Sequence, residues 1–142
     1  MSINVIAVGK MKKEFLSLND LYLKRCGFFS KIKIDQLKDA SIEKESENII
    51  KKLTENSRKI LFAPDGKTVK NSRYIASLLK SYSNLTFIIG GAEGVGESVK
   101  KRCNEIISVS NLIFPHQLFR IIVLEQIYRG FCINNNHPYH KE

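Results

Sequence analysis

The sequence predicts an α/β fold: a single domain, residues 1–142, with a mostly parallel sheet flanked by helices. Short β-branched runs alternate with amphipathic stretches along the whole chain. This alternation is typical of parallel sheets whose strands are joined by helical crossovers. A length of 142 residues fits one domain with one core. No repeat, low-complexity stretch or long linker divides the chain.

The first half of the chain predicts three strands and two helices. The strands are expected at Ile3–Val8, which ends at a glycine, at Lys31–Leu37 and at Lys59–Ala63. Glu14–Arg25 carries apolar residues at helical spacing and predicts the first helix. Ser41 is expected to cap the second, whose narrow apolar stripe is typical of a surface helix.

The second half begins with Pro64–Lys67, where proline fixes φ and glycine permits positive φ, so a tight turn is expected. Asn71 or Ser72 is expected to cap the helix that follows. The remaining elements are strands at Leu85–Ile89 and near Ile106–Val109, and helices near Glu97–Asn104 and from about Pro115 to Gly130.

The last of these helices is apolar in nearly every direction around its axis. The residues that give it this character are Leu118, Phe119, Ile121, Ile122, Val123, Leu124, Ile127, Tyr128 and Phe131. Such a helix must be covered on more than one side. The sheet is one cover, and a second copy of the helix is the other that we expect, which predicts a homodimer. The alternative is a fully internal helix, which small open sheets disfavour.

The net charge of +9 indicates the class of partner. A basic surface attracts phosphate backbones through counterion release. Nucleic acid is therefore favoured over a solvated lysine-rich surface without a partner. No apolar run approaches the ~20 residues that span a bilayer, and the N-terminus does not resemble a signal peptide. We therefore expect a cytoplasmic protein that does not contact membranes.

Thiol and metal chemistry are not expected. Cys26, Cys103 and Cys132 are far apart and form no C-x-x-C pair, which predicts reduced thiols. Cys103 and Cys132, which lie at the ends of predicted helices, are expected to be buried. His137 and His140 lie close in sequence, but Pro138 separates them and no cluster of cysteines or carboxylates supports them. We therefore expect no metal.

The loop Gly90–Gly96 follows the most apolar strand and nearly matches a phosphate-binding P-loop. The decisive lysine is replaced by Glu97, which would repel phosphate, and the glycine spacing does not fit the dinucleotide fingerprint. What remains is a loop where backbone closely approaches a ligand, or a tight structural turn. Ligands bind at the carboxyl ends of parallel strands, so this loop and Ser110–His116 mark the expected site.

The last helix and the tail contain further candidates. His116 and Arg120 are four residues apart and share one helical face near its start, where a functional role and a structural role are both open. Glu125 and Arg129 have the same spacing, which predicts an ion pair, with an interface or substrate role second. Residues 134–142 hold two of the 3 histidines and a tyrosine, which predicts a tail that stacks on a base or closes over an active site.

Taken together, these residues resemble the RlmH family over the whole chain. This family comprises bacterial 23S rRNA (pseudouridine-N3-)methyltransferases of the SPOUT superfamily. The motifs that carry the resemblance are Ala7–Lys10, Asp65–Lys67, Ile88–Gly94, Pro115–His116 and Asn136–Glu142. The last three together are specific to the family.

The resemblance implies a SPOUT-type domain with a C-terminal trefoil knot that works as a homodimer and binds S-adenosylmethionine. It implies methylation of N3 of a pseudouridine in the helix-69 stem-loop of 23S rRNA, in the assembled ribosome. Ala63 and Ala92 depart from the aspartate and the proline that the family usually has. Matched motif by motif, the implied cofactor contacts are Phe62, Gly90, Val109, Ser110, Asn111, Leu112, Ile113 and Phe114.

Methyl transfer from a sulfonium is an in-line displacement that needs no metal and no covalent intermediate. We expect His140 or His116 to assist removal of the N3 proton and Tyr139 to position the base. Arg120 and Arg129 are expected to bind phosphate or neutralise the developing charge, and the tail of one subunit to complete the pocket of the other. The alternatives are a non-catalytic ribosome-binding factor and a SPOUT enzyme that acts on another rRNA nucleotide.

Overall fold

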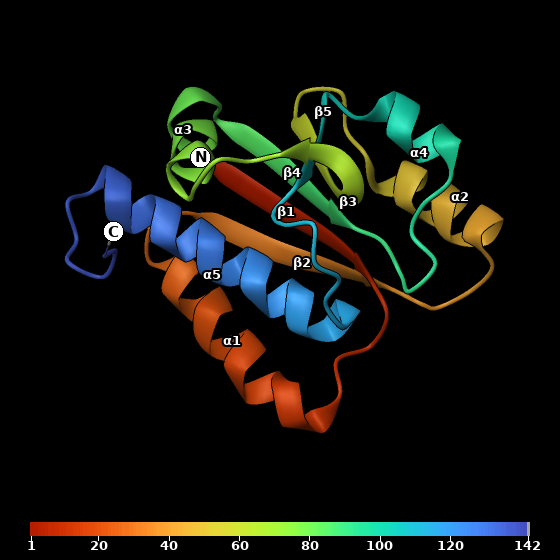
Figure 1. The fold of residues 1–142 in the computed structure, drawn as a ribbon, viewed down its shortest axis with the longest axis horizontal. Helices are drawn as coiled ribbons and strands as arrows, with labels where there is room; N and C mark the ends of the chain where they lie inside the picture. Colours follow the sequence, from red (N-terminus) through yellow and green to blue (C-terminus); the bar gives the residue numbers. More distant parts are fainter. Residues whose placement is uncertain (142) are drawn as a thin grey trace.

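A computed structural model describes residues 1–141 and contains a five-stranded sheet with the strand order β2-β1-β4-β3-β5 (Figure 1). Each neighbouring pair of strands is parallel, which confirms the α/β fold. Along the chain the elements are β1 (Ser2–Val8), α1 (Lys13–Gly27), β2 (Lys31–Leu37), α2 (Ile42–Lys52), β3 (Arg58–Thr68), α3 (Arg73–Ser81), β4 (Asn84–Ile89), α4 (Glu97–Arg102), β5 (Glu105–Ser108) and α5 (His116–Asn134).

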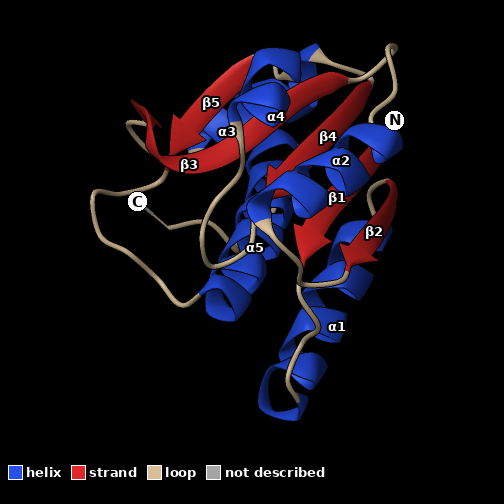
Figure 2. Ribbon diagram, turned by 90° about the vertical axis from the view of Figure 1, so that its right-hand side faces the viewer, coloured by secondary structure: helices blue, strands red, loops and turns tan. Residues whose placement is uncertain are grey.

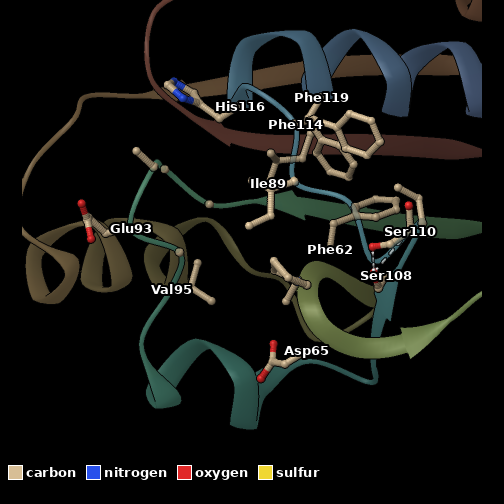
Figure 3. A pocket seen from close by; sticks show the side chains of 18 of the residues that line it. Phe62, Asp65, Ile89, Glu93, Val95, Ser108, Ser110, Phe114, His116 and Phe119 are labelled. Carbon is tan, nitrogen blue, oxygen red and sulfur yellow. Dashed lines mark hydrogen bonds between the residues drawn. The ribbon is translucent and has the colours of Figure 1, made fainter.

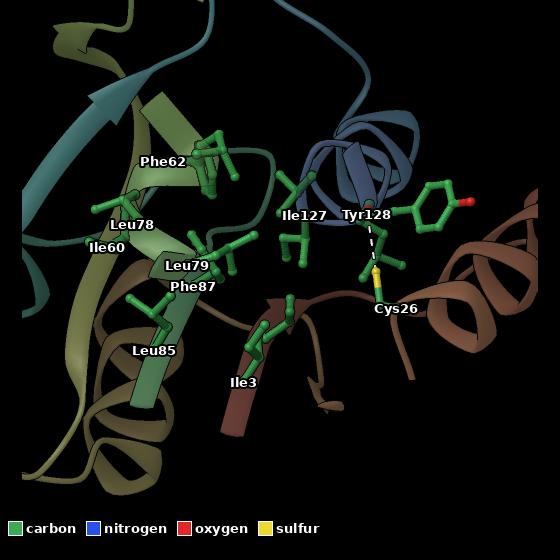
Figure 4. Packing of buried hydrophobic residues seen from close by; sticks show 14 of the residues in the cluster. Ile3, Cys26, Ile60, Phe62, Leu78, Leu79, Leu85, Phe87, Ile127 and Tyr128 are labelled. Atoms are coloured by element: carbon green, nitrogen blue, oxygen red, sulfur yellow. Dashed lines mark hydrogen bonds between the residues drawn. The ribbon is translucent and has the colours of Figure 1, made fainter. Parts of the chain in front are cut away.

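Helices cover both faces of the sheet, and each face has its own apolar core (Figure 2). On one face, Val5 and Phe87 pack against residues of α1, α3 and α5. Figure 4 shows part of this larger core, where the Cys26 thiol donates to the carbonyl oxygen of Leu124 at 3.5 Å. On the other face, Ile6 and its neighbours pack against α2 and α4. The alternating side chains of each strand divide between these two cores.

The expected caps are met in two different ways. The Ser41 side chain accepts a hydrogen bond from the backbone N–H of Lys44 at 3.2 Å, which confirms this residue as the cap of α2. At α3, Ser72 occupies the cap position without a side-chain bond to the helix backbone. The Asn71 side chain instead accepts from the N–H of Arg73 at 3.0 Å. At the start of α3, Ser72 therefore occupies the cap position, while Asn71 provides the side-chain hydrogen bond.

The expected turn at residues 64–67 is a bulge inside β3 rather than the end of the strand. Phe62 and Lys67 both pair with Ile107 of β5, so the four residues between them leave the ladder and the strand then resumes. The bulge approaches β5 closely, because a Cβ on Gly66 would lie 2.8 Å from backbone atoms of Ile106 and Ile107. The Pro-Asp-Gly-Lys pattern correctly predicts a local irregularity of the backbone. The strand continues beyond it because residues 67 and 68 pair with β5.

The helix α5 extends to Asn134, beyond the expected end near Gly130. It packs between α1 and α3 on the sheet, so the chain itself supplies much of the cover that its apolar pattern demands. The expected homodimer, in which a second copy covers the rest of the helix, stays a prediction. In residues 1–141, no helix is both long and apolar enough to cross a bilayer.

The close approach at Gly66 predicts the effect of a single methyl group. Gly66→Ala is expected to lower the free energy of unfolding by about 1–3 kcal/mol, because the methyl group overpacks the contact with β5. Gly27→Ala is the matched control, since nothing lies within 4 Å of its added Cβ, and its stability should be unchanged or raised by up to about 1 kcal/mol. Urea unfolding measures both. Equal stability of the two variants would contradict the close contact.

Candidate functional site

A cavity of about 640 Å³ lies beside the bulge in β3 and at the carboxyl ends of β4 and β5 (Figure 3). This is the edge of a parallel sheet where ligands bind. Three separate chain segments and the first turn of α5 form its walls. The lining residues are Phe62–Asp65, Ile89–Val95, Lys100, Ile107–Ser110, Leu112–His116 and Phe119.

The glycine loop forms one wall, and its backbone is tightly folded. The N–H of Gly94 donates to the carbonyl of Gly91 at 3.0 Å, and Gly94 has a φ of 82°, a left-handed conformation that favours glycine. A Cβ on Gly90 would lie 2.8 Å from the Val95 side chain. Space therefore excludes a side chain at Gly90, whereas at Gly94 the backbone conformation is what favours glycine.

Two side chains of α2 contact or closely approach the glycine loop on the α2 side of the sheet. Ser46 Oγ accepts the N–H of Gly96 at 3.1 Å. The Glu45 carboxylate is 6% exposed, accepts the N–H of Ala40 at 2.8 Å, and lies 3.0 Å from where a Cβ on Gly91 would stand. Neither residue is predicted as part of the site from the sequence. Their only signal was a glutamate and a serine on the narrow apolar side of a charged helix.

The segment after β5 forms the opposite wall through hydrogen bonds of its own. Ser108 Oγ donates to the carbonyl of Ser110 at 2.7 Å, and Ser110 Oγ accepts the N–H of Leu112 at 3.0 Å. These bonds turn the chain across the strand ends. They leave the large apolar side chains of Leu112 and Ile113 at the cavity rim, 71% and 86% exposed.

The floor of the cavity is aromatic. The ring of Phe119 lies 5.6 Å from that of Phe62 and 6.0 Å from that of Phe114, measured between centroids. At the rim, Lys100 Nζ lies 3.0 Å from Asp65 Oδ2, and this hydrogen bond lowers the pKa of the carboxyl group. The site therefore combines an apolar, aromatic floor with charged groups at its mouth.

The structure brings most of the expected cofactor residues together. Phe62, Gly90 and, of residues 109–114, all except Asn111 line the cavity. The two departures from the family pattern, Ala63 and Ala92, line it as well. His116 also faces it, and its Nε2 lies 3.1 Å from where a Cβ on Gly9 would stand. One of the four expected catalytic residues is thus at the cavity.

Arg120 is buried beneath the site and is not among the residues that line the cavity. Its side chain is 2% exposed and donates to Gln36 Oε1 at 2.9 Å and to the carbonyl oxygens of Val8 and Gly9. Burial lowers the pKa of the guanidinium. These hydrogen bonds connect the end of β1 to the first turns of α5. The contacts of Arg120 in this structure therefore stabilise the fold.

Tyr139 and His140 lie in a separate cluster on the C-terminal part of α5. The Tyr139 hydroxyl donates to Glu125 Oε2 at 2.7 Å, and Arg129 bonds Glu125 at 2.6 Å and His140 Nδ1 at 3.1 Å. Burial and the hydrogen bonds to Tyr22 and Glu125 raise the pKa of Tyr139, so the phenol keeps its proton. The expected ion pair of Glu125 and Arg129 is confirmed. The last residue of the tail motif, Glu142, lies outside the described residues.

The cluster is remote from the cavity of the same chain. Along α5, ten residues separate Phe119 at the cavity from Arg129, which corresponds to about 15 Å of helix. Neither Tyr139 nor His140 lines the cavity. The structure therefore divides the expected catalytic residues into His116 at the cavity, Arg120 beneath it, and the tail pair at the other end of the helix.

Cys26 and Cys132 are buried, as expected for Cys132, whereas Cys103 is only partly buried. Burial raises the pKa of Cys26 to about 12 and that of Cys103 to about 11. Such thiols stay protonated at neutral pH and are poor nucleophiles. In the part of the chain that the structure describes, no group of three or more His, Cys, Asp or Glu side chains is placed to hold a metal ion.

Comparison with known proteins identifies the family. A family model described as predicted SPOUT methyltransferase matches residues 1–140. The ribosomal RNA large subunit methyltransferase H of Metamycoplasma arthritidis is 43% identical, over 99% of this chain and 100% of that protein. Its counterpart in Streptococcus thermophilus is 38% identical, again over 99% and 100%. The chain belongs to the RlmH family of SPOUT methyltransferases.

A solved structure supports the SPOUT fold independently. A tRNA methyltransferase from Aquifex aeolicus aligns with a TM-score of 0.57, over 91% of this chain and 70% of that chain. The sequence identity is 14%, so the likeness concerns the fold alone. The resemblance implies a cofactor at this cavity, which lies at the edge of a parallel sheet where ligands generally bind.

The buried arginine of the SPOUT domain yields a stability prediction. Arg120→Met leaves the carbonyls of Val8 and Gly9 without their donor and should lower the unfolding free energy by about 1–3 kcal/mol. Lys24→Met on exposed α1 is the control and should change it by less than about 0.5 kcal/mol. Urea unfolding measures the stability of both variants. Titration with S-adenosylmethionine and a methyl-transfer assay measure the function of the folded variants. Unchanged stability with lost methyl transfer would instead give Arg120 a catalytic role.

Proposed function

We propose that this protein transfers the methyl group of S-adenosylmethionine to N3 of a pseudouridine in the helix-69 stem-loop of 23S rRNA. The substrate is the assembled ribosome in the cytoplasm. The observation that carries the proposal is the cavity beside the β3 bulge and at the ends of β4 and β5, formed by the segments that the RlmH resemblance implies. Relatives named ribosomal RNA large subunit methyltransferase H match over their full length.

The cavity fits S-adenosylmethionine in size and chemistry. Its volume of about 640 Å³ lies within the range of small-molecule sites. The floor of Phe62, Phe114 and Phe119 suits a planar, apolar base. A side chain on Gly90 would collide with Val95, so glycine there keeps the backbone accessible to the ligand. Phe62, Gly90 and residues 109–114 would hold the cofactor.

When bound, S-adenosylmethionine would supply a methyl group that its positively charged sulfur activates. The sulfur–methyl bond breaks as the N–C bond forms, and the leaving group is a neutral thioether. The protein must orient the acceptor nitrogen in line with this methyl group and accept the N3 proton of the imide. His116 lines the cavity and can accept the proton directly. His140 is the other candidate, and it needs to reach a cavity other than that of its own chain.

A homodimer allows the tail to complete the site of the partner. The helix α1 lies beside α5 and presents Leu18 and Leu21, which share one helical face and are 40% and 41% exposed. Pairing of two copies through this surface would bury these side chains. It would bring the tail cluster of one protomer to the cavity of the other. There Tyr139 would position the base, and Arg129 would neutralise the charge that develops on the imide.

The trefoil knot that the resemblance implies belongs to the same proposal. Residues 109–115 start from the edge strand β5 and reach the end of β1, where His116 lies against Gly9. The segment thus crosses the ends of β3 and β4 beside the glycine loop. Threading it through that loop would fix both cavity walls relative to each other.

The activity is tested with ribosomes from a strain that lacks its own helix-69 methyltransferase. The purified protein and methyl-labelled S-adenosylmethionine are added, and the label is mapped by mass spectrometry of rRNA fragments. We expect label on a pseudouridine of that stem-loop. Label elsewhere in the rRNA would keep the methyltransferase and reject this substrate. No label, on ribosomes that a known enzyme methylates, would favour a non-catalytic ribosome-binding factor.

The role of the tail is tested by substitution and mixing. His140→Ala and Tyr139→Phe should lose most activity with unchanged cofactor affinity, because neither residue lines the cavity of its own chain. Gly90→Val should lose cofactor binding. Mixing His140→Ala with Gly90→Val chains should restore about a quarter of the wild-type rate, since half of the dimers then hold one intact shared site. No recovery on mixing would contradict a site shared between protomers.

A further inference from the structure

A second cavity lies on the other side of the β3 bulge from the cofactor cavity. It has a volume of about 540 Å³ and opens between α3 and the edge strand β5. Among the described residues, Ile107 is the one shared by the two linings. We call this second cavity the α3 groove, lined by Arg58, Lys67, Tyr74, Ser77, Leu78, Ser81, Tyr82, Glu105, Ile106 and Ile107.

The carboxylate in the α3 groove is neutralised by its neighbours. Arg58 bonds Glu105 at 3.0 Å, and the Tyr74 hydroxyl donates to the other carboxylate oxygen. Burial, together with this hydrogen bond, raises the pKa of Tyr74 to about 12, so its proton stays in place at neutral pH. The Arg58 guanidinium also lies 4.8 Å from the centroid of the Tyr82 ring. The groove is thus a fixed aromatic and cationic surface without a free negative charge.

The surroundings of the groove are basic, in contrast to the segment around α2 on the opposite face of the sheet. Residues 57–84, which form β3, α3 and the start of β4, contain a single acidic residue, Asp65, against Arg58, Lys59, Lys67, Lys70, Arg73 and Lys80. Residues 35–56, which include α2, are acidic on balance, with Asp35, Asp39, Glu43, Glu45, Glu47 and Glu55 against Lys38, Lys44, Lys51 and Lys52. Positive charge therefore gathers on the side of the sheet edge that carries the groove.

Two lysines are available to a ligand here. Lys67 lines the groove and Lys80 lies one helical turn from Ser77, which also lines it. Both lysines are exposed, and within residues 1–141 neither is paired with a carboxylate. Long, mobile ammonium groups of this kind gain free energy when they replace the counterions of a phosphate backbone.

We propose that the α3 groove binds the sugar–phosphate backbone of the RNA substrate, next to the nucleotide that enters the cofactor cavity. The inference rests on the proposed function and adds a contact surface to it. The two cavities lie on either side of residues 63–66, so an RNA strand that extends from one to the other follows the sheet edge. Aromatic side chains beside cations are the usual surface for such a strand.

The test compares two double variants that remove the same charge from opposite faces. Lys67→Gln/Lys80→Gln alters the groove, and Lys51→Gln/Lys52→Gln on α2 is the matched control. The probe is a fluorescein-labelled RNA stem-loop with the helix-69 sequence and its pseudouridines. Its Kd is measured by fluorescence anisotropy at several KCl concentrations. Cofactor affinity and Tm are measured for each variant, and KM and kcat are measured with unmethylated ribosomes.

We expect the groove variant to bind the RNA more weakly and to lower the slope of log Kd against log KCl by about 2, one for each lost phosphate contact. It should raise KM for ribosomes, while cofactor affinity and Tm match those of the control. An equal change in both variants would overturn the proposal, because it would reflect net charge alone. So would a wild-type protein that does not bind the RNA.

The outcomes separate this inference from the proposed function. Salt-dependent RNA binding that needs the groove lysines, without methylation of helix 69, would support the groove and reject the substrate. Methylation of helix 69 that does not depend on Lys67 and Lys80 would support the function and overturn the groove. A higher KM for ribosomes with unchanged RNA binding would also overturn it and indicate contact with a ribosomal protein.

Discussion

Close approach of backbone to its neighbours at the carboxyl edge of the sheet is the constraint on which the site depends. Gly66 lies against the backbone of β5, Gly90 against Val95, and Gly9 against the ring of His116. A side chain at Gly66 would push the β3 bulge away from β5, and one at Gly90 would distort the glycine loop itself. Glycine at these places lets the β3 bulge, the glycine loop and α5 meet around one space.

Side chains from elsewhere in the fold then fix these segments in place. Arg120 joins the end of β1 to the first turns of α5, which carry His116 and Phe119 to the cavity. Glu45 and Ser46 of α2 support the glycine loop from the opposite face of the sheet. Buried polar groups that are fully hydrogen-bonded hold one arrangement and disfavour others. The site is thus preorganised by residues that do not touch the ligand.

The sequence predicted the elements and the two cavity loops because both depend on local patterns: β-branched runs, apolar spacing and glycine clusters. It did not predict that the 64–67 turn would lie inside β3, since this depends on pairing with a strand about forty residues later. Helical spacing places Arg120 on the same face as His116 and so predicts a catalytic role. Its hydrogen-bond partners at the ends of β1 and β2 are distant in sequence and are seen only in the structure. Contacts between distant segments leave no periodic signal in the sequence.

The two ends of α5 explain why one chain cannot assemble every expected catalytic group. A continuous helix keeps Phe119 and Arg129 about 15 Å apart, and Tyr139 is fixed at the far end by Glu125 and by the ring of Tyr128, whose centroid is 4.7 Å away. A flexible tail would be able to fold back toward its own cavity, but the hydrogen bonds of this tail hold it in place. The continuous helix and the hydrogen-bonded tail thus keep Tyr139 and His140 away from the cavity of their own chain, which is why the proposed role of the tail requires a second protomer.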